Sequence, residues 1–126
     1  MQILLIILLA VHVLSSIFWA GSTFVLARNG GVGACALFRP QIGAASVSAL
    51  SGLSLWHLLH PGSFQRTEQI LATGAAAAIL ALLVQIVVVR PGLRSGETSP
   101  RVAAGYRASA ALLVVTIICM ATARYI

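Results

Sequence analysis

The stretch that decides the fold covers residues 3–26, which read ILLIILLAVHVLSSIFWAGSTFVL. It holds one titratable side chain, His12, and exceeds the ~20 apolar residues with which a helix spans a bilayer. Trp19 follows seven residues later, nearly two helical turns, so both side chains share one face. Ionisable groups inside membrane helices usually face a bundle interior or a site. The run therefore predicts a membrane helix in which His12 is either functional or hydrogen-bonded to a neighbouring helix.

The composition of the whole chain is that of an integral membrane protein. Of the 126 residues, 60% are hydrophobic and 8% are charged, and the mean hydropathy is +1.02. A soluble domain of this size carries roughly three times that charge, so a soluble fold is excluded. The amino terminus lacks the basic region of a signal peptide, and its apolar run is too long for one. We therefore expect residues 3–26 to remain as the first membrane helix.

Three further apolar stretches follow, separated by connections rich in glycine and proline. We expect a single domain, residues 1–126, with helices at about residues 3–26, 41–60, 69–89 and 104–126. Pro40 suits the first turn of the second helix, Cys35 falls in the loop before it, and Arg90-Pro91-Gly92 should end the third helix. The predicted fold class is all-α: a polytopic membrane protein with an up-down bundle of four transmembrane helices.

Small residues predict where these helices come close together. Ser48 and Gly52 stand four residues apart, as do Gly105 and Ser109, and this spacing lets two helix backbones approach each other. The run of small residues at 74–78 favours the same kind of contact. Because only four helices exist to bury these faces, we also expect either a homo-oligomer or partner subunits of a membrane complex within the lipid bilayer.

The arginines predict how the bundle is oriented. The net charge of +6 comes from eight arginines and two glutamates. They lie at segment ends and form no basic stripe with interleaved aromatic residues, which excludes nucleic acid as a partner and favours lipid headgroups. Six lie around the first and third connections and two on the opposite side: Arg28, Arg39, Arg90, Arg94, Arg101 and Arg107 against Arg66 and Arg124. The positive-inside bias then places both termini outside the bacterial inner membrane.

Four side chains are candidates for binding a cofactor in the outer half of the bundle: His12, Trp19, His57 and Met120. At ~1.5 Å per helical residue, His12 lies roughly 13 Å from the outer end, Met120 roughly 9 Å and His57 roughly 4 Å. Imidazole and thioether groups ligate haem iron, and His with Met suits Cu(I), so these three are candidate metal ligands. Trp19 could pack against a bound macrocycle. Alternatively, Met120 fills a gap and His57 forms a hydrogen bond at the interface.

Other chemistries find little support in the sequence. The only acids, Glu68 and Glu97, are expected on opposite membrane faces, which excludes catalysis by paired carboxylates. No serine lies in a nucleophile-elbow motif, and no acid or lysine lies inside a membrane segment, which disfavours a proton-coupled transporter. The two cysteines, Cys35 and Cys119, predict no disulfide framework.

Short motifs resemble the membrane domain of the copper-resistance D (CopD) family. They are His12 with Trp19-Ala20-Gly21 and Arg28, more loosely residues 49–53, and the ending MATARY at residues 120–125. That superfamily includes the four-helix, haem-binding protoporphyrinogen oxidase of the J type. The resemblance implies haem b with His12 as its first-helix ligand, or copper handling across the inner membrane. The J-type enzyme also relies on a lysine in a later helix, and this chain has no lysine, so the resemblance does not extend to that reaction.

The sequence thus predicts a small bacterial inner-membrane protein that binds haem b or copper between its helices, with a redox or metal-handling role. The alternative is a non-catalytic transmembrane subunit that packs against a larger membrane complex. Four short helices without a soluble domain suit that role equally well. Whether the protein is an enzyme is left open by the sequence.

Overall fold

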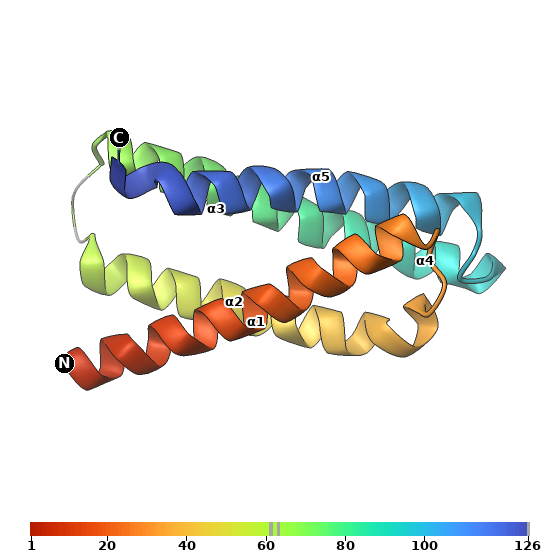
Figure 1. Ribbon diagram of the computed structural model, residues 1–126, viewed down its shortest axis with the longest axis horizontal. Coiled ribbons are helices and arrows are strands. Elements are labelled where there is room, and N and C mark those ends of the chain that lie inside the picture. The colour runs from red at the N-terminus through yellow and green to blue at the C-terminus, as the bar shows by residue number, and fades with distance from the viewer. Residues whose placement is uncertain (61, 63, 126) are drawn as a thin grey trace.

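The computed structural model describes residues 1–60, 62 and 64–125, and it consists of long helices joined by short connections (Figure 1). The first two helices are α1 (Gln2–Arg28) and α2 (Ala34–Leu59). The third long helix is continuous, in the order α3 (Arg66–Val84), the π-helical turn η1 (Gln85–Val89), α4 (Arg90–Gly92) and the 3-10 turn η2 (Leu93–Ser95). The last is α5 (Pro100–Thr122), followed by the 3-10 turn η3 (Ala123–Tyr125). The described residues contain no strand, so the all-α prediction is confirmed.

Each of the four long helices is long and apolar enough to cross a membrane. They alternate in direction, so both chain ends lie at the same end of the molecule as the connection between α2 and α3 (Figure 1). We call this the terminal end. The opposite end carries the α1–α2 and α3–α5 connections and most of the arginines, and we call it the arginine end. The up-down arrangement predicted from the sequence is therefore present.

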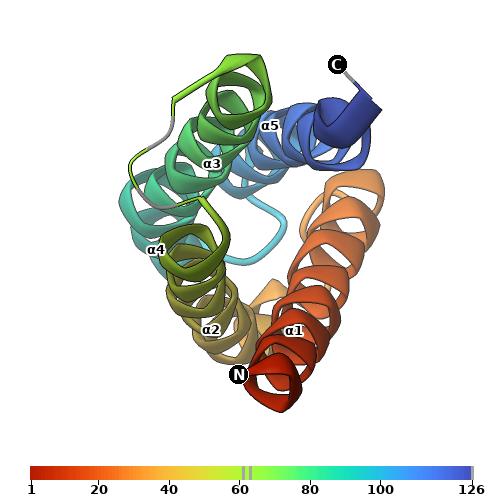
Figure 2. The same cartoon turned by 90° about the vertical axis from the view of Figure 1, so that its left-hand side faces the viewer.

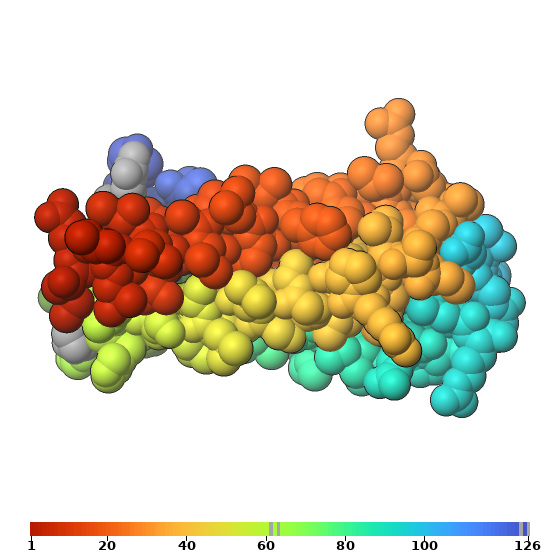
Figure 3. All heavy atoms as spheres, turned by 90° about the horizontal axis from the view of Figure 1, so that it is seen from below, coloured from red at the N-terminus to blue at the C-terminus, as the bar shows by residue number. Residues whose placement is uncertain are grey.

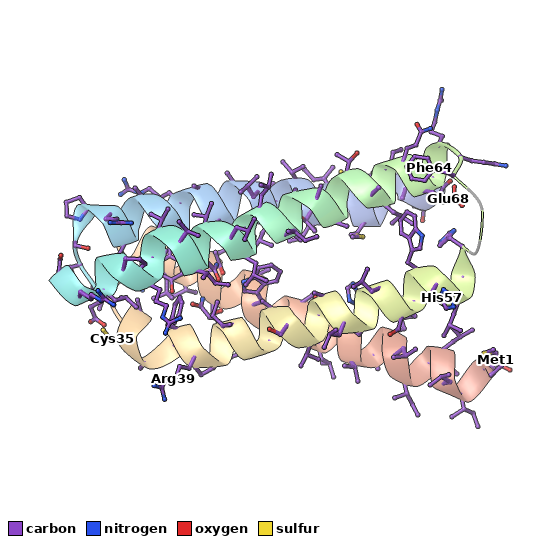
Figure 4. All side chains as sticks on the ribbon, turned by 180° about the vertical axis from the view of Figure 1, so that it is seen from behind. Met1, Cys35, Arg39, His57, Phe64 and Glu68 are labelled. Carbon is purple, nitrogen blue, oxygen red and sulfur yellow. The ribbon has the colours of Figure 1, made fainter. Side chains whose placement is uncertain are left out.

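The bundle is built from two helical hairpins. α1 packs along α2, and α3 with its continuation packs along α5; α1 also contacts α5, whereas α2 and α3 meet at few points. Figure 2 shows the four helices arranged around a common axis, and Figure 3 shows α1 and α2 side by side along one face of the molecule. At the terminal end, where His57 and Glu68 are labelled in Figure 4, the ribbons of α2 and α3 stand apart.

Two clusters of buried apolar side chains hold the hairpins together, and each takes residues from all four long helices. The middle cluster is formed by Trp19, Ala20, Ala45, Ala81 and Leu113. The second cluster, at the arginine end, is formed by Leu26, Ala34, Val89, Val102 and Tyr106. Among the described residues no comparable cluster lies toward the terminal end, where no side chain of α1 from Gln2 to Phe18 is buried.

Glycines set the close approach of α3 and α5. A Cβ atom added to Gly105 would lie 2.5 Å from Val89 Cγ2, and one added to Gly74 would lie 2.9 Å from Cys119 Cβ. The predicted contacts at Gly105 and at the small-residue run that begins with Gly74 are therefore confirmed. Hydroxyl groups of α5 also donate hydrogen bonds to carbonyls of α3, from Ser109 to Ala81 at 3.3 Å and from Thr116 to Gly74 at 2.9 Å.

Helix α2 begins earlier than the sequence predicted, at Ala34 instead of near residue 41. Cys35 therefore lies in its first turn and not in a loop, and Pro40 lies inside the helix. The cause is Glu97, in the connection between α3 and α5, whose carboxylate accepts a hydrogen bond from the Cys35 amide at 3.2 Å. Hydrogen bonds from the amides of Cys35 and Gly33 lower the pKa of Glu97. A carboxylate at this position stabilises a helix N-terminus.

The third long helix continues through Arg90–Gly92, where the sequence predicted its end. In a regular α-helix Pro91 would lack an N–H for the carbonyl of Val87 and would collide with it. The π-helical turn η1, which ends at Val89, two residues before Pro91, widens the helix and so accommodates the ring. Arg101 then supplies the missing donor, because its Nη2 donates to the Val87 carbonyl at 3.2 Å and its Nε to the Val88 carbonyl at 3.1 Å.

Candidate cofactor site

Trp19 lies where the four helices meet, and its indole takes part in a buried hydrogen-bond chain. The side chain is 5% exposed, and Nε1 donates to Gln85 Oε1 at 3.0 Å. Gln85, the first residue of the π-helical turn, donates through Nε2 to Thr23 Oγ1 at 3.0 Å. The Thr23 hydroxyl in turn donates to the Trp19 carbonyl at 2.7 Å. The structure thus places Trp19 in the protein core, where its indole N–H is already hydrogen-bonded to Gln85.

A second buried chain of hydrogen bonds joins α5, α2 and α1. Tyr106 Oη donates to Gln41 Oε1 at 2.7 Å, and Gln41 Nε2 donates to Ser22 Oγ at 2.9 Å. Within the described residues no buried side-chain nitrogen or oxygen lacks a partner. A fully satisfied network of this kind holds helices in register, and it leaves no polar group for a ligand.

The Trp19–Gln85 bond leads to a first prediction. Replacing Trp19 with phenylalanine keeps an aromatic ring but leaves Gln85 Oε1 without its donor, which should cost about 1–2 kcal/mol of stability. The free energy of unfolding in mixed detergent micelles measures this loss. Trp56→Phe is the matched control, because Trp56 is partly exposed and its indole has no hydrogen bond among the described residues. Equal stability of the two variants would show that the bond contributes nothing.

His12 lies two turns from Trp19 toward the terminal end and packs against α2. Its Nδ1 lies 2.8 Å from the Ser48 carbonyl oxygen and 3.3 Å from Ser51 Oγ. Because a carbonyl only accepts, Nδ1 carries the proton and Nε2 carries the lone pair. Gly52 gives the ring its room, since a Cβ there would lie 2.9 Å from His12 Cε1. The predicted close approach at Ser48 and Gly52 is therefore confirmed.

The hydrogen bond of His12 is compatible with both interpretations of this residue. It is an interhelical bond between α1 and α2, as a purely structural histidine would make. The same bond fixes the ring orientation and leaves Nε2 available, which is the usual arrangement of histidines that bind metals. In the part of the chain that the structure describes, Nε2 of His12 has no hydrogen-bond partner.

His57 is placed away from His12. It is exposed and lines a shallow groove between α1 and α2, together with Leu4, Leu8, Leu53, Ser54 and Leu58. His57 follows Gly52 by five residues, which turns it about 140° around α2 from the face that holds His12. Figure 4 shows it near the terminal end of α2, with Cys35 at the other end of the same helix.

Met120 lies on the other hairpin. Its side chain is 38% exposed, and its Cε lies 3.6 Å from the position that a Cβ of Gly74 would take. Among the described residues no group of three His, Cys, Asp or Glu side chains is placed to hold a metal ion.

His60, the third histidine, holds the connection at the terminal end. Its Nδ1 lies 2.9 Å from Glu68 Oε1, and its ring is 5.7 Å from that of Trp56, measured between centroids. Glu68 Oε2 also accepts the backbone N–H of Gln65 at 3.0 Å, which caps α3. The sequence alone did not reveal this pair, because it forms across the connection between two helices.

Comparisons with protein-family models, curated proteins and solved structures found no match for this chain. The resemblance to the copper-resistance D family therefore stays a prediction that depends on the motifs around His12 and Met120.

Proposed function

We propose that this chain is a membrane protein with a redox or metal-handling role that binds haem b or copper through His12. The observation that carries the proposal is the imidazole of His12, held by the Ser48 carbonyl over Gly52. Its Nε2 has no partner among the described residues. A neutral imidazole with one nitrogen fixed in this way is a good ligand for iron or copper.

The surroundings of His12 support a bound group. The two apolar clusters lie at the middle and at the arginine end, whereas α2 and α3 carry Gly52 and Gly74 at the level of His12. Gly52 makes room for the imidazole of His12, and a flat apolar macrocycle bound to that imidazole would add contacts at this level of the bundle. When bound, either haem or copper would supply one-electron redox chemistry, and the protein would supply the ligand and exclude water.

The absorption spectrum and the metal content of the purified chain test this proposal. The protein is expressed once with a haem precursor in the medium and once with added copper. A Soret band, or copper that remains bound in stoichiometric amount through purification, is the expected result. Protein that carries neither group after both preparations would contradict the proposal.

We also propose that the terminal end faces the outside of a bacterial inner membrane. The arginine end carries six exposed arginines, Arg28, Arg39, Arg90, Arg94, Arg101 and Arg107, and such residues are enriched on the cytoplasmic side. A reporter that is active only outside the cytoplasm should work when fused to either terminus. A reporter that is active only in the cytoplasm should fail there, and activity of that reporter would refute the orientation.

A second function, that of a subunit packed against other membrane helices, is favoured by the surface of α1. Ile3, Leu14 and Ile17 are 73%, 68% and 62% exposed, on a stretch from Gln2 to Phe18 that buries no side chain. This surface would contact lipid or a helix of a partner or of a second copy. A mass above that of the monomer in native membrane extracts is expected in the latter case. A strict monomer in extracts and in mild detergent would contradict it.

A further inference from the structure

The exposed face of the third long helix changes from apolar to basic just after Val87. Ile79, Leu83 and Val87 are 55%, 48% and 59% exposed, and they stand four residues apart, so they form one stripe along the helix. Arg90 and Arg94 follow Val87 by three and seven residues and continue this stripe at the arginine end. One helix face therefore carries an apolar part within the membrane span and a basic part next to it.

Arg101 of α5 adds a third guanidinium to this face. Its Nη2 donates to the Val87 carbonyl at 3.2 Å and its Nε to the Val88 carbonyl at 3.1 Å. These two bonds hold the exposed guanidinium at the level of Val87, where the basic part of the stripe begins. A guanidinium has five N–H donors, so three remain for a ligand. We call Arg90, Arg94 and Arg101 the basic cluster.

No acid of the protein balances the basic cluster. The chain has two glutamates. Glu97 accepts a hydrogen bond from the first turn of α2, and Glu68 lies at the terminal end of the bundle (Figure 4). In the part of the chain that the structure describes, no arginine of the cluster takes part in an ion pair. Two like charges four residues apart on a helix repel each other, so an anion bound between Arg90 and Arg94 would relieve this repulsion.

We propose that this face of the third helix binds an anionic phospholipid from the leaflet at the arginine end. The phosphate lies on the basic cluster, because guanidinium groups pair with phosphate oxygens through two N–H donors at once. An acyl chain lies along the stripe formed by Ile79, Leu83 and Val87. The ligand is a lipid and not a free phosphate because the apolar stripe adjoins the cluster directly. A headgroup with a net negative charge is favoured because the cluster contains three positive charges and no acid.

Native mass spectrometry of the purified chain, released from detergent micelles, tests this proposal. The micelles contain either phosphatidylglycerol, which is anionic, or phosphatidylcholine with the same acyl chains, which is zwitterionic. The chain should retain one phosphatidylglycerol molecule at a concentration at which little phosphatidylcholine stays bound. The double variant Arg90→Gln/Arg94→Gln should bind phosphatidylglycerol about 25-fold more weakly, a factor of about five for each arginine removed. Its binding of phosphatidylcholine should change little.

The double variant Arg39→Gln/Arg107→Gln is the matched control, because it lowers the net charge by the same amount. Arg39 belongs to α2 in the other hairpin. Arg107 follows Gly105 by two residues, which turns it about 200° around α5 from the side that contacts the third helix. This control should keep its affinity for phosphatidylglycerol within about twofold of wild type. Circular dichroism checks that both variants are folded, and the single variants Arg90→Gln and Arg94→Gln replace the double variant if it is not.

Three results would overturn the proposal. Equal affinity of wild type for the two lipids would show that the headgroup charge is not recognised. An equal loss of phosphatidylglycerol in both double variants would show that net charge alone matters and that Arg90 and Arg94 form no site. The third concerns glycerol phosphate, which carries the phosphate without acyl chains and should not displace the bound lipid. Displacement by glycerol phosphate at the concentration of the lipid would identify a site for free phosphate instead.

Discussion

Replacing His12 with alanine should abolish the binding of haem or copper. His12 is held by an interhelical hydrogen bond through Nδ1 and has no partner for Nε2 among the described residues, whereas His57 is exposed and His60 is paired with Glu68. The loss is measured as the Soret absorbance or copper content per chain of protein purified in parallel with wild type. His57→Ala is the matched control and should keep full occupancy, because that side chain is exposed on another face.

A second measurement separates lost ligation from lost folding in the His12 variant. Exogenous imidazole added to His12→Gly protein should enter the vacated space and restore part of the spectrum, which an unfolded protein would not show. If His12→Ala keeps full occupancy and an unchanged spectrum, ligation by His12 is wrong. The residue would then serve only as a hydrogen-bond partner of Ser48, a bond worth about 0.6–2 kcal/mol in a membrane bundle.

Gly105→Leu should have the largest effect on stability, a loss of about 3 kcal/mol. A Cβ at this position would lie 2.5 Å from Val89 Cγ2 and 3.3 Å from Val88 Cγ1, and both neighbours are stiff β-branched side chains. The two helices would have to separate, which would also strain the hydrogen bond between Ser109 and the Ala81 carbonyl. Unfolding in mixed micelles, followed by circular dichroism, measures the change.

Gly21→Ala is the matched control for this substitution. Gly21 also lies inside a long helix, but a Cβ there would meet no atom within 4 Å. Alanine favours the helix over glycine, so this variant should be as stable as wild type or more stable by up to ~1 kcal/mol. A Gly105→Leu protein that unfolds together with Gly21→Ala would show that the contact between α3 and α5 is not as tight as the structure indicates.

The number and direction of the helices could be predicted because they depend on the length of apolar runs, which is a local property of the sequence. The ends of two helices could not be predicted, because they depend on contacts with residues in other segments of the chain. The start of α2 depends on Glu97, which comes from a connection far along the chain. The continuation of the third helix past Pro91 depends on Arg101, which replaces a hydrogen bond that the proline removes.

The candidate site was predictable in the same partial way. His12 stands out because it is the one titratable group in a long apolar run. Its partner Ser48 does not stand out, because the residue that faces a given side chain depends on the register of two helices and not on either sequence alone. The spacing predicted that Trp19 shares a face with His12, but the helix pattern could not reveal that the indole nitrogen of Trp19 donates to Gln85.

The π-helical turn also decides which side chains of the third helix point inward. Ala77, Ala81, Gln85 and Val89 are all buried, and each follows the previous one by four residues. In a regular α-helix every step of four overshoots a full turn by about 40°, so three steps would swing Val89 about 120° away from the direction of Ala77. The π-helical turn at Gln85–Val89 has more residues per turn than an α-helix, so each of its residues rotates less about the helix axis. This smaller rotation offsets part of the excess and keeps Val89 on the buried side. One continuous helix can thereby present Ala81 to the middle cluster and Val89 to the cluster at the arginine end.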